Sequence, residues 1–144
     1  MGMRDLASNI KVVTAIGNAT LAADNTPVAV DGAGYNSATL VLDIGSGGIT
    51  FSGTNKIEFV LTHSDDDVTY TAVTDADMIN LTGISGGIIK SLIAAHASAA
   101  VYKFGYRGGK RHRKLLADFS GTHGTGTPIG AHWLLGEPAV APVA

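Results

Sequence analysis

The chain has 144 residues, of which 45% are hydrophobic and only 15% are charged, and its net charge is −2. This length suits one domain with its own core, and the balance of charge argues against a protein that coats nucleic acid. There are 19 glycines and no cysteine, which excludes disulfides and thiolate chemistry. Because an average soluble domain is roughly 25% charged, we expect another protein to cover part of this surface.

Period-two alternation of apolar residues, interrupted by turn residues, predicts an all-β protein. About nine short strands are expected, at residues 11–16, 26–31, 37–44, 56–63, 68–73, 87–92, 99–106, 111–119 and 127–135. Closely spaced turn signals rich in Gly, Asn and Asp are typical of an antiparallel β-sandwich or jelly roll. Only residues 75–81 and 91–100 could hold helical turns, and at most one short helix is expected, near Asp75.

The clearest hairpin signal spans residues 56–73, where two alternating segments flank a polar turn at residues 64–67. On its first strand Ile57, Phe59 and Leu61 share one face, and they are expected to point into the core. The segments 37–44 and 99–106 are apolar on both faces, as strands are between layers or at a subunit contact. Trp133, the only tryptophan, is expected in the core or at an interface.

Both ends of the chain are expected to extend from the domain. Residues 1–9 form the expected N-terminal arm, residues 10–136 the sandwich and residues 137–144 a Pro- and Ala-rich C-terminal arm. Because Pro138 and Pro142 lack a backbone N–H, this segment is not expected to join a central sheet, and it either frays or lies along a neighbouring subunit. No signal peptide and no bilayer-spanning apolar run are found, so synthesis in the cytoplasm and no membrane partner are expected.

The residues that could carry chemistry are scattered. Asp65, Asp66 and Asp67 suggest calcium, but the glycine and the terminal glutamate of an EF-hand loop are missing, and we interpret them as turn-formers. The five histidines lack the spacing of a zinc site. The sequence contains neither a Gly-x-Ser-x-Gly nucleophile motif nor a phosphate-binding Gly-Lys-Ser/Thr loop. We therefore expect no enzyme, no cofactor and no metal.

The strongest charge feature is the basic segment, defined as residues 107–114, which holds five of the ten Lys and Arg residues. On a strand Arg111 and Arg113 would point the same way. The preceding Tyr102, Phe104 and Tyr106 would suit stacking on nucleic-acid bases. We favour instead pairing of the cations with Asp65–Asp67, with Asp118 or with an acidic neighbouring protein, and we expect no direct nucleic-acid contact. The candidate interface residues are Arg107, Lys110, Arg111, Arg113, Pro138 and Pro142.

Four stretches of the sequence resemble small structural proteins of tailed bacteriophages and prophages, in particular capsid decoration (cement) proteins. They are MRDL at residues 3–6, HSDDDVTYTAV at 63–73, YRGGKRHRKLLADFSGT at 106–122 and GEPAVAP at 136–142. The resemblance implies a β-sandwich or jelly-roll subunit, often a homotrimer, on the outside of an icosahedral head. There it would bridge major capsid protein subunits and stabilise the capsid, and no catalytic residues come with the family.

Two other functions stay open at this point. A head–tail connector or tail protein would form rings, usually of about six or twelve subunits. A carbohydrate-binding jelly roll would be a monomer that binds glycans through exposed aromatic residues. The decoration protein is the preferred interpretation, with itself and the major capsid protein as partners and the virion surface as its location.

Overall fold

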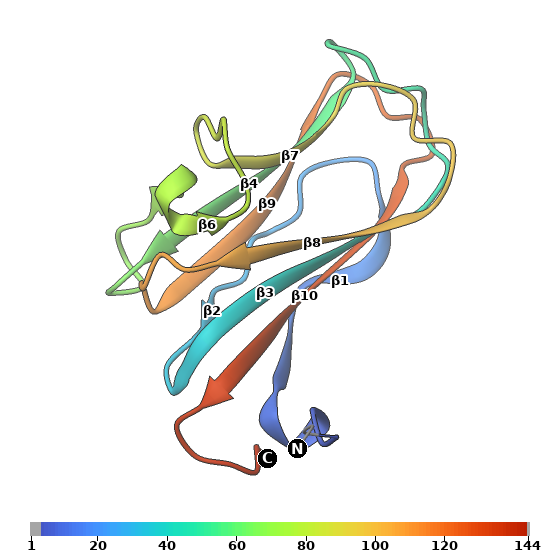
Figure 1. Cartoon of the computed structure of the whole chain (residues 1–144). Coiled ribbons are helices and arrows are strands. Elements are labelled where there is room, and N and C mark those ends of the chain that lie inside the picture. Colours follow the sequence, from blue (N-terminus) through green and yellow to red (C-terminus); the bar gives the residue numbers. More distant parts are fainter. Residues whose placement is uncertain (1–3, 144) are drawn as a thin grey trace.

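A computed structural model describes residues 4–143, and residues 1–3 and 144 of the two expected arms lie outside the described residues (Figure 1). Ten strands and two short 3-10 turns make up the described chain. In chain order they are η1 (Ala7–Asn9), β1 (Lys11–Leu21), β2 (Val30–Asp31), β3 (Tyr35–Ile44), β4 (Lys56–Ser64), β5 (Thr71–Ala72), η2 (Asp75–Asp77), β6 (Met78–Ile79), β7 (Ile88–Leu92), β8 (Ala100–Tyr106), β9 (His112–Ser120) and β10 (Thr127–Pro138).

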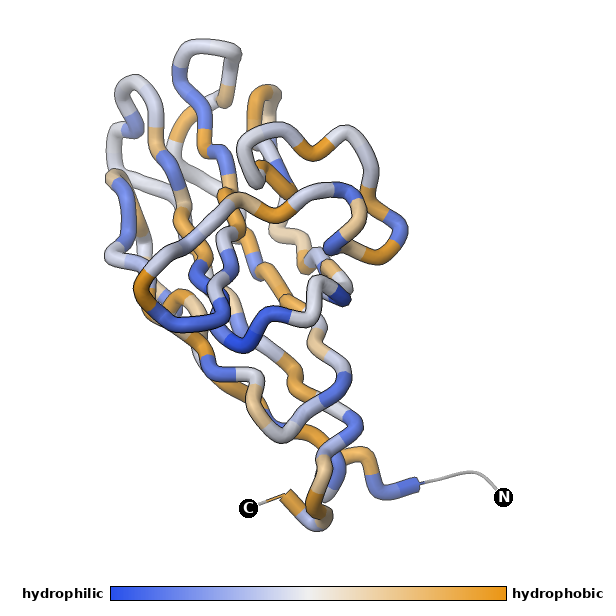
Figure 2. Tube along the Cα trace, turned by 90° about the vertical axis from the view of Figure 1, so that its left-hand side faces the viewer, coloured by the Kyte–Doolittle hydropathy of each residue, from blue (hydrophilic) through white to orange (hydrophobic). Residues whose placement is uncertain are grey.

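The strands form two antiparallel sheets that pack face to face. Sheet I has the order β1-β10-β3-β8-β6, and sheet II has the order β2-β9-β4-β5, with β7 also paired to β4. In Figure 1, β3, β8 and β10 lie together in one layer and β4, β7 and β9 in the other. Hydrophobic and hydrophilic positions alternate along several strands, as an inward and an outward face require (Figure 2). The expectation of an all-β sandwich is confirmed.

The core lies between the two sheets. Leu40 and Leu42 of β3 face it from sheet I, and Ile57, Phe59 and Leu61 of β4 face it from sheet II, all fully buried as their spacing predicts. Trp133 of β10 is also 0% exposed, so its place is the core. Each such side chain stabilises the fold by about 1.5–3 kcal/mol through loss of apolar surface to water.

The expected hairpin at residues 56–73 is much shorter than its pattern indicates. Strand β5 has two residues, which pair with Thr62 and His63, whereas β4 pairs with β9 and β7 over most of its length. The cause is the turn between them, where an oxygen of Asp66 accepts hydrogen bonds from the N–H groups of Val68 and Thr69 at 2.9 Å. These residues are thereby lost to the ladder, and the expected strand at 68–73 was too long.

Four other elements differ from expectation, and the first is β1, which runs to Leu21 although the pattern predicts an end at residue 16. Of the expected strand at residues 26–31 only Val30–Asp31 pairs, and β6 was not expected at all. The short helix expected near Asp75 is the single 3-10 turn η2, closed by a bond from the N–H of Asp77 to the Thr74 carbonyl at 3.0 Å and capped by a bond from the N–H of Thr74 to Asp77 Oδ2 at 2.8 Å. Residues 91–100 are not helical. No helix in the described range 4–143 has the length and apolarity needed to cross a membrane.

The C-terminal strand runs beyond the expected boundary at residue 136. β10 extends to Pro138, which pairs with Tyr35 of β3. Pairing with β1 stops at Leu135, so the other edge of β10 is open beyond that point, and a proline there removes no bond to β1. After the strand the N–H of Val143 bonds to the carbonyl of Ser8 at 2.8 Å, which brings the two terminal segments together (Figure 1).

Candidate binding pocket

A pocket of about 440 Å³ opens at the end of the sandwich where β8 leads into β9 and β2 leads into β3. Its position follows from the topology, because β3 and β8 belong to sheet I whereas β2 and β9 belong to sheet II. The lining residues are Gly32, Ala33, Gly34, Tyr35, Asn36, Ser37, Ala38, Asp65, Tyr106, Arg107, Gly109, Lys110, Arg111 and Arg113. All four basic candidate interface residues therefore meet in one place.

Arg113 is the buried cation of this pocket. Its side chain projects from β9 between the sheets, and only 5% of the residue is exposed. The guanidinium carbon lies 4.4 Å from the ring centre of Tyr106 and 5.2 Å from that of Trp133. Nη2 donates one long hydrogen bond, 3.3 Å, to the carbonyl of Lys110, whereas Nε and Nη1 are buried without a partner. Two aromatic rings thus contact the buried guanidinium through cation–π interactions, in the place where a carboxylate partner is usual.

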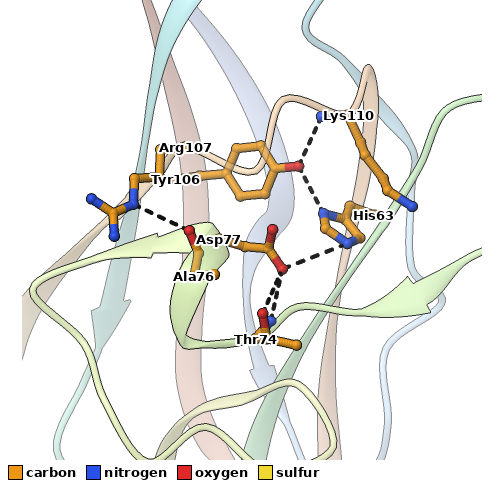
Figure 3. A network of polar contacts seen from close by, with 7 residues as sticks. All are labelled: His63, Thr74, Ala76, Asp77, Tyr106, Arg107 and Lys110. Atoms are coloured by element: carbon orange, nitrogen blue, oxygen red, sulfur yellow. Dashed lines mark hydrogen bonds and ion pairs between the residues drawn. The ribbon is translucent and has the colours of Figure 1, made fainter.

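A buried polar network holds the Tyr106 ring in position (Figure 3). The Tyr106 hydroxyl lies 2.8 Å from Nδ1 of His63 and accepts the N–H of Lys110 at 3.2 Å. Nε2 of His63 lies 3.8 Å from a carboxylate oxygen of Asp77, which also accepts the N–H of Thr74. The network links β4, η2 and the β8–β9 connection, so it fixes the wall of the pocket from three directions.

The protonation states in this network follow from burial. Burial lowers the pKa of His63 below its ordinary value, although the nearby Asp77 carboxylate opposes that shift. Burial also raises the pKa of Tyr106. Both groups are therefore neutral near pH 7, and both are almost fully buried. Their chemical contribution is to hold one aromatic ring against the Arg113 guanidinium.

The other basic residues have different partners from those expected. Arg111 precedes β9 and makes a two-bond ion pair with Asp31, with both nitrogen–oxygen distances 2.8 Å, instead of pairing with Asp65–Asp67 or Asp118. This contact holds the pKa of Asp31 well below its usual value. Arg107 Nε donates to the carbonyl of Ala76 at 3.2 Å. Pro138 and Pro142 do not line this pocket.

Four members of the site were not predicted as site residues: Asp31, His63, Asp77 and Trp133. They lie far apart along the chain and carry no common spacing, so only the fold brings them together. One signal was present, namely that Tyr102, Phe104 and Tyr106 alternate along one strand, and Tyr106 does face the core.

The aspartate turn lies beside the pocket and has a local role. Asp66 accepts bonds from Ser64, Val68 and Thr69, and these bonds lower its pKa to about 2. The Tyr70 hydroxyl donates to Asp67. Among residues 4–143 no three His, Asp or Glu side chains converge as metal ligands would.

Comparisons of the chain with protein-family models, with curated proteins and with solved structures find no match. The site is therefore interpreted from its own geometry.

Proposed function

We propose that this protein is a structural component of a bacteriophage virion that decorates the outside of the head and stabilises it by bridging major capsid protein subunits. The observation that carries the proposal is a group of large exposed aliphatic side chains on the outward face of sheet I, which lie there beside the exposed charges of Asp43 and Lys103. A face of this kind suits a protein whose copies pack against one another.

The exposed aliphatic side chains are spread across the outward face of sheet I. The register aligns Val12 of β1, Leu134 of β10, Thr39 of β3, Gly105 of β8 and Ile79 of β6 in one row. In this row Val12 is 58% exposed and Ile79 is 46% exposed. Four residues from Gly105 on the same strand, Val101 lies opposite Asp43 of β3 and is 65% exposed. Three strands thus present a large aliphatic side chain outward.

The outward face of sheet II is different in chemistry. Lys56 and Glu58 of β4 form an ion pair of 3.2 Å, and Glu58 lies opposite Asp118 of β9. Lys114 of β9 lies over the ring of Tyr70 at 4.2 Å. Charges that find partners within one chain suit a face that stays in water. The contrast favours sheet I as the surface that other proteins cover.

In this proposal copies associate through sheet I, and the paired terminal segments contact the capsid. Those segments expose Leu6 and Val140 and are joined by the bond from Val143 to Ser8. Each copy would contribute a modest binding free energy, and many copies on one head would give a large total, because each bound subunit raises the effective concentration of its neighbours. The protein would oppose capsid expansion by binding alone.

The first test is the mass of the purified protein by light scattering behind size-exclusion chromatography, at two concentrations. We expect a trimer, and we expect Val101→Lys to shift the mass toward the monomer because a charge would enter the contact. The control is Val68→Lys, which places the same charge at a turn residue that is 81% exposed. A wild-type monomer at both concentrations would refute self-association through sheet I.

The second test addresses the capsid directly. Phage particles from cells that carry the gene would be purified on a density gradient, and their proteins identified by mass spectrometry. Recovery of this protein with the major capsid protein on tailless heads supports decoration, and recovery only with tails would move the assignment to a connector or tail protein. A glycan-binding module has less support, because Trp133 is fully buried and offers no stacking surface.

A further inference from the structure

The geometry points to a second property, which does not depend on the proposed function: the pocket around Arg113 binds a small oxyanion, meaning a carboxylate or phosphate group. The guanidinium of Arg113 would be its main partner, with Lys110 at the rim.

Arg113 is a buried arginine that has no carboxylate partner among the described residues. Buried arginines are normally paired with a carboxylate, because removing an unpaired charge from water is costly. In the described part of the chain no carboxylate oxygen lies within 4.0 Å of Arg113, and two of its nitrogens lack a hydrogen-bond partner. The Tyr106 and Trp133 rings offset part of the cost through their π faces. An anion in the pocket would supply the missing counter-charge.

The Arg113 guanidinium is reachable from the pocket. Arg113 is among the lining residues, and its one hydrogen bond, from Nη2 to the Lys110 carbonyl, is 3.3 Å long. A bond of that length is weak, so an anion can take over this donor at small cost. Gly32 lies directly against the guanidinium, where a Cβ atom would overlap Nη2. The wall is therefore shaped around this side chain.

The residues around the pocket carry more positive than negative charge. Four lining residues are basic and one, Asp65, is acidic. Arg111 is neutralised by Asp31, and Arg107 is bonded to the Ala76 carbonyl. Arg113 and Lys110 therefore leave an excess of positive charge over Asp65. A planar guanidinium binds both carboxylate and phosphate through paired hydrogen bonds, so the ligand class is the oxyanion.

The experiment uses Trp133 fluorescence, because the Arg113 guanidinium touches this single tryptophan. The full chain is titrated at constant ionic strength with sodium acetate, with inorganic phosphate and with chloride, up to about 50 mM, well above a millimolar Kd. We expect saturable changes with acetate or phosphate and none with chloride. Saturation by acetate alone would assign carboxylate ligands, and saturation by phosphate alone would assign phosphate ligands.

Two variants that each remove one positive charge separate the pocket from general screening. Arg113→Met should lower the affinity for the anion by about tenfold or more, because the variant loses a charge-assisted hydrogen bond to it. Lys103→Met, on an exposed position of β8 outside the pocket, should leave the affinity within about twofold. If Arg113→Met does not fold, the Arg113 Nε–H signal in the NMR spectrum of the wild-type protein must shift with anion concentration along the same curve as the Trp133 fluorescence. Equal affinities for the two variants, or no saturation by either oxyanion in the wild type, would overturn the inference.

Discussion

Replacement of Tyr106 by phenylalanine tests whether the buried network stabilises the fold. The substitution removes one hydroxyl and keeps the aromatic ring, so the stacking on Arg113 is preserved. It leaves Nδ1 of His63 and the N–H of Lys110 without the partners that they now have at 2.8 and 3.2 Å. His63 is 4% exposed, so water cannot fully replace the lost bond.

The magnitude follows from these two unpaired groups. A buried polar group without a partner costs about 1–3 kcal/mol, and the partly buried N–H of Lys110 costs less. We expect Tyr106→Phe to lower the free energy of unfolding by about 2 kcal/mol. For a domain of this size that corresponds to a fall in Tm of roughly 4–8 °C.

The assay is urea unfolding at pH 7, followed by Trp133 fluorescence, since this side chain is fully buried in the fold and becomes exposed on unfolding. The matched control is Tyr70→Phe, which removes a hydroxyl that bonds to Asp67 at the surface. The control should change the free energy of unfolding by less than about 0.5 kcal/mol. If both variants lie within that limit, the network does not stabilise the fold and our account of the pocket wall is wrong.

Three further predictions concern other links between sequence and stability. Burial lowers the pKa of His63, so as the pH falls through about 6.5 this histidine takes up a proton in the unfolded state before it does so in the folded state. The free energy of unfolding should therefore decrease over this pH range, and it should decrease less steeply in His63→Gln. Phe59→Ala should cost about 3–5 kcal/mol in urea unfolding, whereas Val68→Ala at the exposed turn should cost less than about 0.5 kcal/mol. Gly126→Ala should cost more than about 1 kcal/mol, because φ is 92° and the new Cβ would lie 2.6 Å from the Leu21 carbonyl oxygen. Gly53→Ala, with open space, should be nearly neutral in the same urea unfolding experiment.

The sequence by itself determined where most strands lie and which side of β4 is buried. The spacing of Ile57, Phe59 and Leu61 at every second position is a local property, because successive side chains of a strand point to opposite faces. For Trp133 the sequence left the core and an interface both open, and the structure places it in the core. Turn residues set the ends of the longer strands, although the bonds made by Asp66 shortened one hairpin in a way that alternation does not reveal.

Only the tertiary structure decided which strands are neighbours and therefore what the basic segment does. On β9 Lys114 and Leu116 alternate with Arg113 and Leu115, so each face carries one cation and one leucine, and periodicity could not tell which face is buried. Pairing of β9 with β4 turns Arg113 inward against rings from sheet I. Pairing of β9 with β2 places Arg111 beside Asp31, 80 residues earlier in the chain. Contacts between distant strands depend on how the two sheets pair and pack, and the spacing of residue types along the chain does not predict that packing.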